Sequence, residues 1–509
     1  MVARAYSMGT YGMDAFPVEV ETDLSSGLPS FEVVGLPDTA VKESRDRVRA
    51  AMKNCGFDFP LKRIVINLAP ADKRKEGPIY DLPLLVSLLK SSEQLDSPTS
   101  DAVFLGELSL GGAVRPVRGV LPMAVKAKEA GFHRLFVPAG NAAEAAAVKG
   151  LKVYPVENVT QLMEHLTGKE LIPQAKHKFQ AGERDPLLDF ADVKGQVVAK
   201  RALEIAASGS HSVIMIGPPG SGKSMLAKRL PSILPDMTFQ EALEVTMIHS
   251  VAGNLPSGSS LLSSRPFRSP HHTISTAGLS GGGTSPRPGE ISLAHNGVLF
   301  LDELPEFPRP AMEALRQPME DGKVTISRVH GNATFPCKFM VVAAMNPCPC
   351  GYFGHPTRPC TCQPYAVERY LSRISGPLLD RLDLHVEAAP VEVTQLASKK
   401  KGESSASIRK RVNAARQRQV ERYAGMGWTC NAEIPSAKLH EFCPITMEAE
   451  MMLKTAFDQF GFSARSYDRI LRVARTIADL ESCDAISTDH LMEALQFRTL
   501  DRKFWGSLR

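Results

Sequence analysis

The feature that most constrains this chain is a glycine-rich segment, Gly217 to Ser224 (GPPGSGKS), between two apolar segments. Residues 212–216 predict a buried strand, and residues 225–230 predict a helix that begins directly after the glycines. Glycines let backbone N–H groups turn inward on phosphate oxygens, and the helix N-terminus adds its positive dipole. The pattern therefore predicts a phosphate-binding loop in an α/β fold with a parallel sheet.

Within this loop, the lysine and the serine have separate expected roles. Lys223 is expected to reach the β- and γ-phosphates of ATP, and the Ser224 hydroxyl is expected to bind Mg²⁺. The other loop residues predicted to surround the phosphates are Gly217, Pro218, Pro219, Gly220, Ser221 and Gly222. A glycine-rich turn without a ligand is the alternative interpretation.

Two acidic residues follow a second apolar segment. Residues 297–301 predict a buried strand, and Asp302 and Glu303 come directly after it. A parallel strand beside the first would bring both carboxylates to the phosphate edge of the sheet. Asp302 is expected to hold Mg²⁺ through its water shell, and Glu303 is expected to orient and polarise the attacking water. Paired acids also occur in solvated turns, but together with the loop they indicate a nucleotide hydrolase.

A third apolar segment, residues 339–345, ends at Asn346. An amide at that position can orient the attacking water, or it can simply form the turn before Pro347. The family resemblance described below favours the role in orienting water.

Length and composition limit the class of protein. A chain of 509 residues predicts about three domains, and 43% apolar with 23% charged residues excludes disordered and collagen-like proteins. No uncharged apolar run approaches the roughly 18 residues of a membrane span, and the N-terminus has no long apolar segment typical of a secretion signal. The sequence thus predicts a cytoplasmic protein without a membrane partner, whose nine cysteines are reduced thiols or metal ligands.

The pattern of apolar residues divides the chain into an α+β region, an α/β region and a helical region. In the first, residues 134–138 and 151–155 predict strands, Asn141 is expected to cap an Ala-rich helix, and Asn158 or Thr160 to cap another. The last region predicts helices over 447–460, 464–480 and 488–497. The expected divisions are 1–170, a linker at 171–186, 187–395 and 396–509.

Several segments resemble the magnesium-chelatase-like branch of the AAA+ ATPases, specifically the bacterial YifB/ComM family. They are residues 265–275, 281–283 and 288–303, and the resemblance extends over essentially the whole chain. It implies an AAA+ core with an α-helical lid, in a homo-oligomeric ring, usually a hexamer, with ATP at the subunit interfaces. It also implies similarity to helicases that drive DNA branch migration during natural transformation.

The resemblance assigns further site residues. Gln196 lies where the family contacts adenine, and Arg381 lies in the segment that bears the arginine finger, with Arg373 as the alternative. Arg465 lies where a second, sensing arginine is expected, with Arg469 as the alternative. An ordinary surface ion pair is the other interpretation of each arginine.

Two insertions resemble the working parts of related helicases. Residues 268–289 resemble a pore-facing loop, and residues 324–335 predict a β-hairpin that would grip nucleic acid, with a purely structural hairpin as the alternative. His271 and His272 are adjacent and diverge in an extended chain, which argues against a metal site there. The basic residues expected at DNA phosphates are Arg328 and Lys338.

Four cysteines crowd one loop after Asn346. Four thiolates are the ligand set of a closed tetrahedral Zn²⁺ site, and a loop rich in Gly and Pro has little core of its own. Free thiols or a redox pair are the alternatives. The predicted zinc ligands are Cys348, Cys350, Cys360 and Cys362.

Residues 75–80 and 119–131 resemble the segments of Lon-type proteases (the S5 domain 2-like fold) that carry the catalytic Ser and Lys. Here Ile79 occupies the serine position and Leu121 the lysine position. A Ser–Lys dyad needs a hydroxyl and an activating amine, which these residues do not supply. The N-terminal region is therefore predicted to be a ring-forming or DNA-contacting scaffold.

These features together favour an ATP-driven ring motor that translocates on DNA. Residues 399–422 carry nine Lys or Arg and two Glu, a local net charge of +7, against +5 for the whole chain. This basic helix is expected either to face phosphates or to be simply solvated. The alternatives for the whole protein are a chelatase-like ATPase that remodels a protein partner and, less favoured, an ATP-dependent protease.

Overall fold

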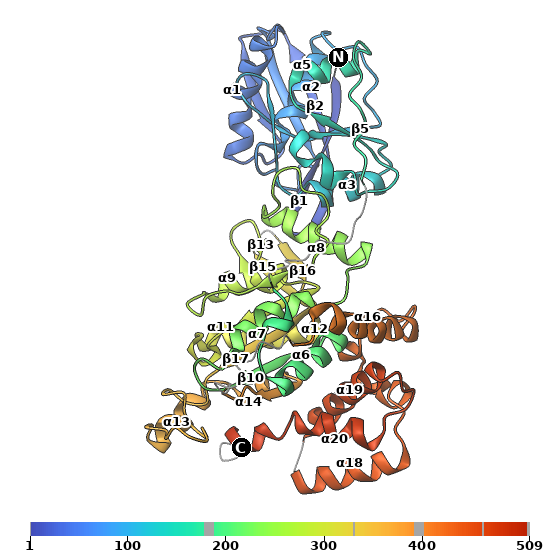
Figure 1. The fold of residues 1–509 in the computed structure, drawn as a ribbon. Helices are drawn as coiled ribbons and strands as arrows, with labels where there is room; N and C mark the ends of the chain where they lie inside the picture. Colours follow the sequence, from blue (N-terminus) through green and yellow to red (C-terminus); the bar gives the residue numbers. More distant parts are fainter. Residues whose placement is uncertain (1, 178–187, 329–330, 391–401, 461–462, 506–509) are drawn as a thin grey trace.

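The computed structural model describes residues 2–177, 188–328, 331–390, 402–460 and 463–505. Figure 1 shows an elongated molecule, with an N-terminal sheet and its helices at one end, a second sheet in the middle and a helical region at the other end. This mixed architecture with a parallel sheet and a helical C-terminal region confirms the predicted fold class. None of the described helices is long and apolar enough to cross a membrane.

The N-terminal sheet has seven strands in the order β3-β4-β2-β1-β5-β8-β9. Strand β2 runs antiparallel to β1 and β4, and the other neighbours are parallel. The strands are β1 (Ala3–Tyr11), β2 (Asp14–Ser25), β3 (Ser30–Val34), β4 (Arg63–Ala69), β5 (Ala102–Phe104), β8 (Arg134–Pro138) and β9 (Lys152–Val156). Its main helices are α1 (Thr39–Asn54), α2 (Asp81–Ser91), α3 (Val120–Glu129) and α5 (Val159–Leu166).

Local sequence signals in this region are partly confirmed. Both predicted strands form, and the Asn158 carboxamide caps α5 by accepting the Gln161 N–H at 2.9 Å. The expected capping role of Asn141 is wrong. Its buried side chain bonds both backbone groups of Val117, at 3.0 and 2.9 Å, and helix α4 (Ala142–Ala145) is only one turn long. A partner 24 residues away satisfies the amide better than the local helix end does.

The second sheet has five parallel strands in the order β11-β14-β17-β10-β18. They are β10 (Val213–Ile216), β11 (Phe267–Arg268), β14 (Gly297–Leu301), β17 (Phe339–Met345) and β18 (Leu384–Glu387). All residues of β10 and β14 are buried, as expected for strands covered on both faces. Because β17 lies between β10 and β14, the segments that follow these three strands meet at one edge.

Helices from the C-terminal region cover one face of this sheet. Helix α19 (Ala464–Leu480) packs on α6 (Val197–Gly209), and both belong to one hydrophobic cluster with the sheet. The region also contains α16 (Ser405–Arg422), α18 (Met447–Phe460), α20 (Thr488–Gln496) and α21 (Leu500–Trp505). Helix α21 returns to pack beside β18.

The N-terminal region contacts two insertions of the second sheet. Helix α8 (Phe239–Ala252), which follows α7 (Lys223–Arg229), packs on α3, and its Ala242 and Val245 belong to the N-terminal hydrophobic cluster. The hairpin of β15 (Lys323–Arg328) and β16 (Gly331–Pro336) reaches the same region, because the Tyr11 hydroxyl donates to the Gly331 carbonyl at 3.0 Å. Figure 1 shows α8, β15 and β16 between the two sheets.

Candidate functional site

The predicted phosphate loop lies between β10 and α7. Gly220 and Gly222 have φ of +76° and +86°, which places both in the left-handed region that favours glycine. The Lys223 ammonium donates to the carbonyls of Gly217 and Pro218, at 2.8 and 2.9 Å. Burial lowers the pKa of Lys223 to about 8, although the nearby Asp302 carboxylate partly opposes this shift. The loop thus presents its lysine at the carboxyl end of the sheet.

The acidic pair lies beside this loop at the end of β14. The Ser224 hydroxyl donates to the Asp302 carboxylate at 2.7 Å, and the Lys223 ammonium donates to the Asn346 side-chain oxygen at 3.3 Å. The Glu303 N–H donates to Asp302 at 3.0 Å, and Glu303 has a φ of +53°. The structure therefore brings together Lys223, Ser224, Asp302, Glu303 and Asn346, as the order of the strands requires.

Gln196 lies on the flank of the phosphate loop, at the beginning of α6. Its side-chain N–H groups donate to the carbonyls of Ser221 at 2.8 Å and Ala389 at 2.6 Å. Gln196 has a φ of +54°, which turns the chain sharply into the helix. It is close enough to border a bound nucleotide, and its predicted contact with adenine stays a prediction.

Sequence reasoning missed one neighbour of the acidic pair. The Nδ1 atom of His272 lies 3.4 Å from the Glu303 carboxylate. The rings of His271 and His272 are tilted by 34° with their centroids 4.1 Å apart, and neither residue belongs to a group of metal-ligating side chains within the described chain. The contact arises because the loop after β11 returns to the end of β14, a relation that no local pattern encodes.

Three of the predicted arginines lie at the opposite edge of the sheet. Arg381, Arg465 and Arg469 line a cavity of about 700 Å³ together with Ser212 and Phe339, which lie at the amino ends of β10 and β17. The phosphate loop follows the carboxyl end of β10. The sheet therefore separates these arginines from the phosphate loop of the same chain.

Arg381 is buried, and its guanidinium already has partners within the chain. Its Nη2 pairs with Glu320 at 2.5 Å, and its Nη1 donates to the Pro377 carbonyl at 2.6 Å. Its buried Nε has no partner within the described chain. Arg373, the alternative finger, is half-exposed and pairs with Glu306 at 2.8 Å.

The two candidate sensing arginines differ sharply. Arg469 donates to the Arg381 carbonyl at 2.7 Å and pairs with the buried Asp383 at 2.5 Å. Burial raises the pKa of Asp383, but Arg469 and His211 outweigh that effect and hold it well below its usual range. Arg465 is exposed and makes no hydrogen bond or ion pair within the described part of the chain. Arg469 thus ties α19 to the sheet, whereas Arg465 is free to meet another molecule.

The four predicted cysteine ligands converge. The sulfur atoms of Cys348, Cys350 and Cys360 lie 3.4–3.7 Å apart, and the Cys350 N–H donates to the Cys362 sulfur at 3.4 Å. Tetrahedral ligation with Zn–S bonds of about 2.3 Å places sulfur atoms about 3.8 Å apart. The separations are much longer than a disulfide bond of about 2.05 Å. The cluster therefore has the donors and the dimensions of a tetrahedral metal site.

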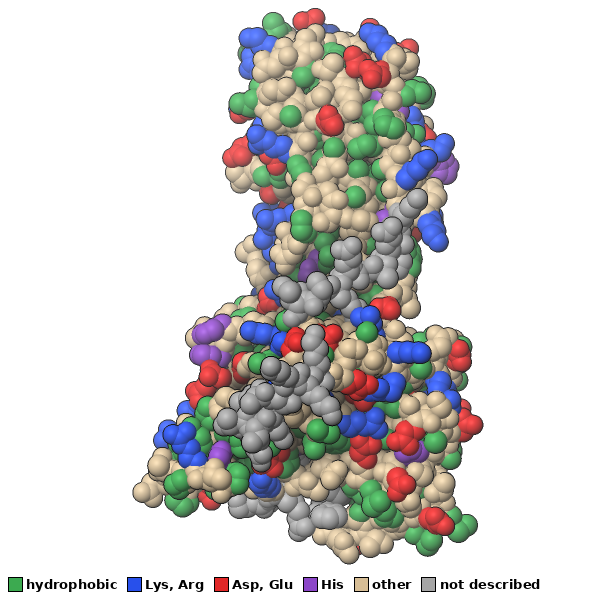
Figure 2. Space-filling model, in the orientation of Figure 1, with side chains coloured by type: hydrophobic (Ala, Val, Ile, Leu, Met, Phe, Trp, Pro, Cys, Tyr) green, Lys and Arg blue, Asp and Glu red, His purple; other side chains and the backbone are tan. Residues whose placement is uncertain are grey.

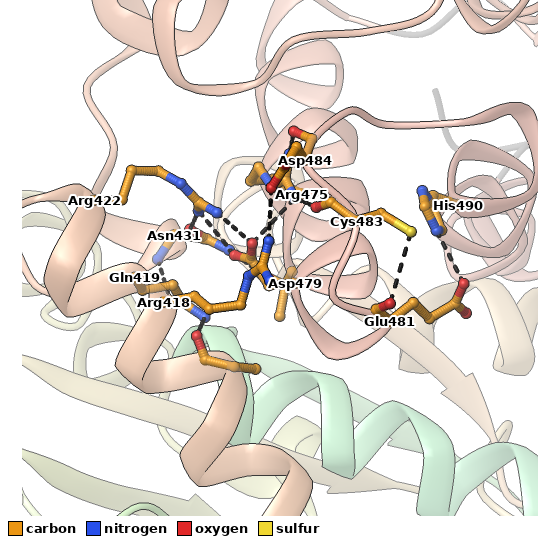
Figure 3. A network of polar contacts seen from close by, with 12 residues as sticks. Arg418, Gln419, Arg422, Asn431, Arg475, Asp479, Glu481, Cys483, Asp484 and His490 are labelled. Carbon is orange, nitrogen blue, oxygen red and sulfur yellow. Dashed lines mark hydrogen bonds and ion pairs between the residues drawn. The ribbon is translucent and has the colours of Figure 1, made fainter.

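A second group of possible ligands, Glu481, Cys483 and His490, is explained without a metal. Figure 3 shows His490 and Cys483 turned toward Glu481. The Nδ1 atom of His490 accepts the Ser487 N–H at 3.0 Å, so in neutral imidazole the proton is on Nε2, which lies 3.0 Å from Glu481. Nδ1 thereby takes part in the capping box of α20, and Nε2 bonds the Glu481 carboxylate.

The basic helix, α16, makes ion pairs with other parts of the same chain. The sequence predicted either contact with phosphates or exposure to solvent, and neither interpretation included these ion pairs. Figure 3 shows Arg422 and Arg475 converging on the buried Asp479, which joins α16 to α19. Arg411 and Arg418 make further ion pairs, with Glu204 at 2.6 Å and Asp484 at 2.8 Å. On the face shown in Figure 2, basic and acidic side chains are interspersed over this region. Residues 399–401 lie outside the described residues.

The predicted hairpin forms, but its two basic residues lie apart. Arg328 is exposed and donates to the Gly283 carbonyl at 3.1 Å, which joins the hairpin to the loop at 268–289. Lys338 pairs with Glu433 at 2.8 Å and lines the cavity at the amino end of the sheet. Their expected contact with DNA phosphates stays a prediction. In the N-terminal region, Ile79 and Leu121 are both buried in the hydrophobic core.

Comparison with known proteins agrees with this geometry. The family model described as magnesium chelatase, subunit ChlI matches residues 189–396, and models described as subunit ChlI of Mg-chelatase and its C-terminal part match residues 20–141 and 402–498. The chain is 44% identical over 501 residues to the protein YifB of Escherichia coli, covering 98% of this chain and 97% of that protein. It is 43% identical over 508 residues to the competence protein ComM of Haemophilus influenzae, covering 98% of each chain. This chain belongs to the YifB/ComM family of magnesium-chelatase-like proteins. Membership confirms the resemblance and indicates an AAA+-like ATPase that uses ATP and Mg²⁺.

Proposed function

We propose that this YifB/ComM-family protein is an ATP-hydrolysing AAA+ ring motor that acts on DNA as a translocase or branch-migration helicase. The observation that carries the ATPase part is the convergence of Lys223, Ser224, Asp302 and Asn346 at one edge of the parallel sheet. Full-length similarity to a protein named for competence supports DNA as the substrate and natural transformation as the process. The proposal places the ring in the cytoplasm, where ATP and incoming DNA meet.

Each residue at that edge has a proposed task. The phosphate loop and Lys223 neutralise the β- and γ-phosphates, while Ser224 and Asp302 provide oxygen ligands for Mg²⁺. When bound, Mg²⁺ neutralises the charge that develops on the transferred phosphoryl group. Glu303 accepts a hydrogen bond from the attacking water and polarises it, and Asn346 fixes that water from the neighbouring strand.

The arginines support assembly into a ring. Because Arg381 and Arg465 lie at the edge opposite the phosphate loop, they are proposed to act on ATP held by a neighbouring subunit. An arginine supplied from a neighbour makes hydrolysis depend on assembly. A homo-hexamer is the proposed assembly. Arg469, which has a structural ion pair, and Arg373, which pairs with Glu306, fit this task less well.

Two further elements belong to the proposal. The proposed units are a Lon-protease-like domain at 1–170 without proteolytic activity, a linker at 171–186, the ATPase core at 187–395 and the lid at 396–509. Buried apolar residues at both dyad positions, Ile79 and Leu121, argue against peptidase activity.

The metal proposed for the cysteine cluster is Zn²⁺.

The second candidate function is remodelling of a protein partner. The matches to chelatase subunit models over all three regions favour it. The test is ATP turnover with no DNA, with single-stranded DNA and with three- and four-way junctions, together with strand exchange on the junctions. The DNA proposal expects stimulated turnover and salt-sensitive binding. If no DNA stimulates ATP turnover and the protein does not bind DNA, the results would favour remodelling of a protein partner.

A further inference from the structure

The loop that carries the four cysteines, residues 348–362 (the cysteine loop), lies directly against the predicted phosphate loop. We propose that a thiophilic divalent metal bound by the four cysteines holds the cysteine loop against Pro219 and behind Asn346, and thereby sets the affinity for nucleotide. This inference rests on the proposed nucleotide binding, but not on hydrolysis or on DNA as the substrate.

The first link is the close approach of the Gly351 backbone to the ring of Pro219. Gly351 has a φ of +83°, and a Cβ atom at this position would lie 2.5 Å from Cδ and 2.7 Å from Cγ of Pro219. Such distances are far shorter than a van der Waals contact, so glycine is required at Gly351. The cysteine loop therefore packs directly on the ring of a phosphate-loop residue.

The second link runs along the chain. Cys348 is buried and lies two residues after Asn346, separated from it by Pro347, whose ring restricts the backbone. The Asn346 side chain accepts a hydrogen bond from the Lys223 ammonium at 3.3 Å. A metal that fixes the Cys348 sulfur consequently fixes the backbone that carries this amide.

A metal is needed because the cysteine loop has few other restraints. Within residues 348–362 only Cys348 and Gly351 are buried, and the other three cysteines lie half-buried against the same hydrophobic cluster. Phe353 is exposed, and its ring centroid lies 6.4 Å from that of Phe504 in α21. The Phe353 N–H donates to the Cys348 sulfur at 3.3 Å, and the Cys350 N–H donates to the Cys362 sulfur. Backbone donors of this kind favour thiolates, but several thiolates this close repel one another unless a cation neutralises them. Four thiolates in tetrahedral arrangement are the ligand set of structural Zn²⁺ sites, and iron is the other metal that such a set holds.

Two glycines of the same loop provide a matched test. Gly354 also has a positive φ, +74°, but a Cβ there would lie 3.7 Å from the nearest atom, the side chain of Lys503. Both Gly351→Ala and Gly354→Ala introduce the same backbone strain, and only the first also displaces Pro219. We expect both variants to keep one zinc per chain by elemental analysis. Gly351→Ala should raise the Kd for a fluorescent, non-hydrolysable ATP analogue at least about tenfold, and Gly354→Ala should leave it within about twofold.

Removal of the metal ligands tests the second half of the inference. Cys360→Ser and Cys362→Ser should lose zinc and weaken analogue binding by a similar factor, whereas Cys483→Ser, outside the loop, should change neither. Thermal unfolding of each variant shows whether the core remains folded. Equal Kd values for Gly351→Ala and Gly354→Ala, or full nucleotide affinity in folded zinc-free protein, would overturn the inference. A wild-type protein that binds the analogue but does not hydrolyse ATP would refute the proposed ATPase and leave this inference intact.

Discussion

The hydroxyl of Ser224 donates a hydrogen bond of 2.7 Å to the carboxylate of Asp302, which lies 78 residues further along the chain. Ser224 lies in the first turn of α7, and Asp302 directly follows β14. The two residues meet because β17 alone separates β10 from β14 in the sheet. Both supply oxygen atoms, the ligands that Mg²⁺ prefers. Their contact marks the point at which the metal of a bound nucleotide is expected.

Replacement of the proposed water-polarising residue should separate binding from turnover. Glu303→Gln keeps the size of the side chain but removes its basicity, so ATP binding should persist while turnover falls about 10²- to 10⁴-fold. Steady-state phosphate release and analogue binding measure the two effects. Glu306→Gln is the control, since it alters another acid on the same loop, and it should retain turnover. Undiminished turnover in Glu303→Gln would refute the assigned role.

Nucleotide affinity should depend on pH through Lys223. Burial lowers the pKa of this ammonium to about 8, so in the free protein it is charged below pH 8 and becomes neutral above it. Phosphates bind the charged form, so affinity should be greatest below pH 8 and fall toward tenfold per pH unit above it. Titration of analogue binding from pH 7 to pH 9.5 measures this. Lys223→Ala should bind weakly with no such slope, and a flat profile in the wild type would contradict the prediction.

Arg381 should act between subunits. Arg381→Ala should bind the analogue normally and lose about 10³-fold in turnover, the effect of removing an arginine finger. Release from Glu320 must precede its action, because the two side chains pair at 2.5 Å in this structure. Mixing Arg381→Ala with Glu303→Gln subunits should restore turnover, since an interface can then combine an intact Glu303 with an intact Arg381. Failure of the mixture to recover activity, in rings shown to exchange subunits, would place the arginine elsewhere. Arg373→Ala is the matched control.

Arg469 should contribute mainly to stability. Arg469→Ala leaves the buried Asp383 carboxylate without its main cation, a change that costs about 3–5 kcal/mol in the free energy of unfolding. Arg465→Ala removes an exposed side chain of the same helix and should change that free energy by less than about 0.5 kcal/mol. Urea unfolding monitored by circular dichroism compares the two variants.

The ion pair between Arg469 and Asp383 also predicts how the stability of the fold changes with pH. The pKa of Asp383 is lower in the folded protein than in the unfolded chain, so its stabilisation is present above pH about 4 and is lost as the pH falls below that value. The difference in stability between the wild type and Arg469→Ala should therefore shrink on acidification. A difference that stays constant down to pH 3 would contradict this.

Local patterns in the sequence determined much of this protein. The run of apolar residues at 297–301 and the glycines at 220 and 222 specify a buried strand and a left-handed turn, because each depends only on neighbouring residues. Asn158 caps the helix that its position predicts. The spacing of the four cysteines likewise suffices to bring their sulfur atoms together, since a short loop spans them.

The tertiary structure alone decided which distant groups share a partner. Asn141 turns from its expected cap to Val117, the arginines of α16 pair with Glu204 and Asp479, and His272 reaches Glu303. The order of strands places the phosphate loop and Arg381 at opposite edges of one sheet, and Gly351 against Pro219. Periodicity and motif spacing describe a segment and its own neighbours, whereas burial and charge pairing are satisfied across the whole fold. For that reason the sequence determined the chemistry of the residues, and only the packing decided which of them act together.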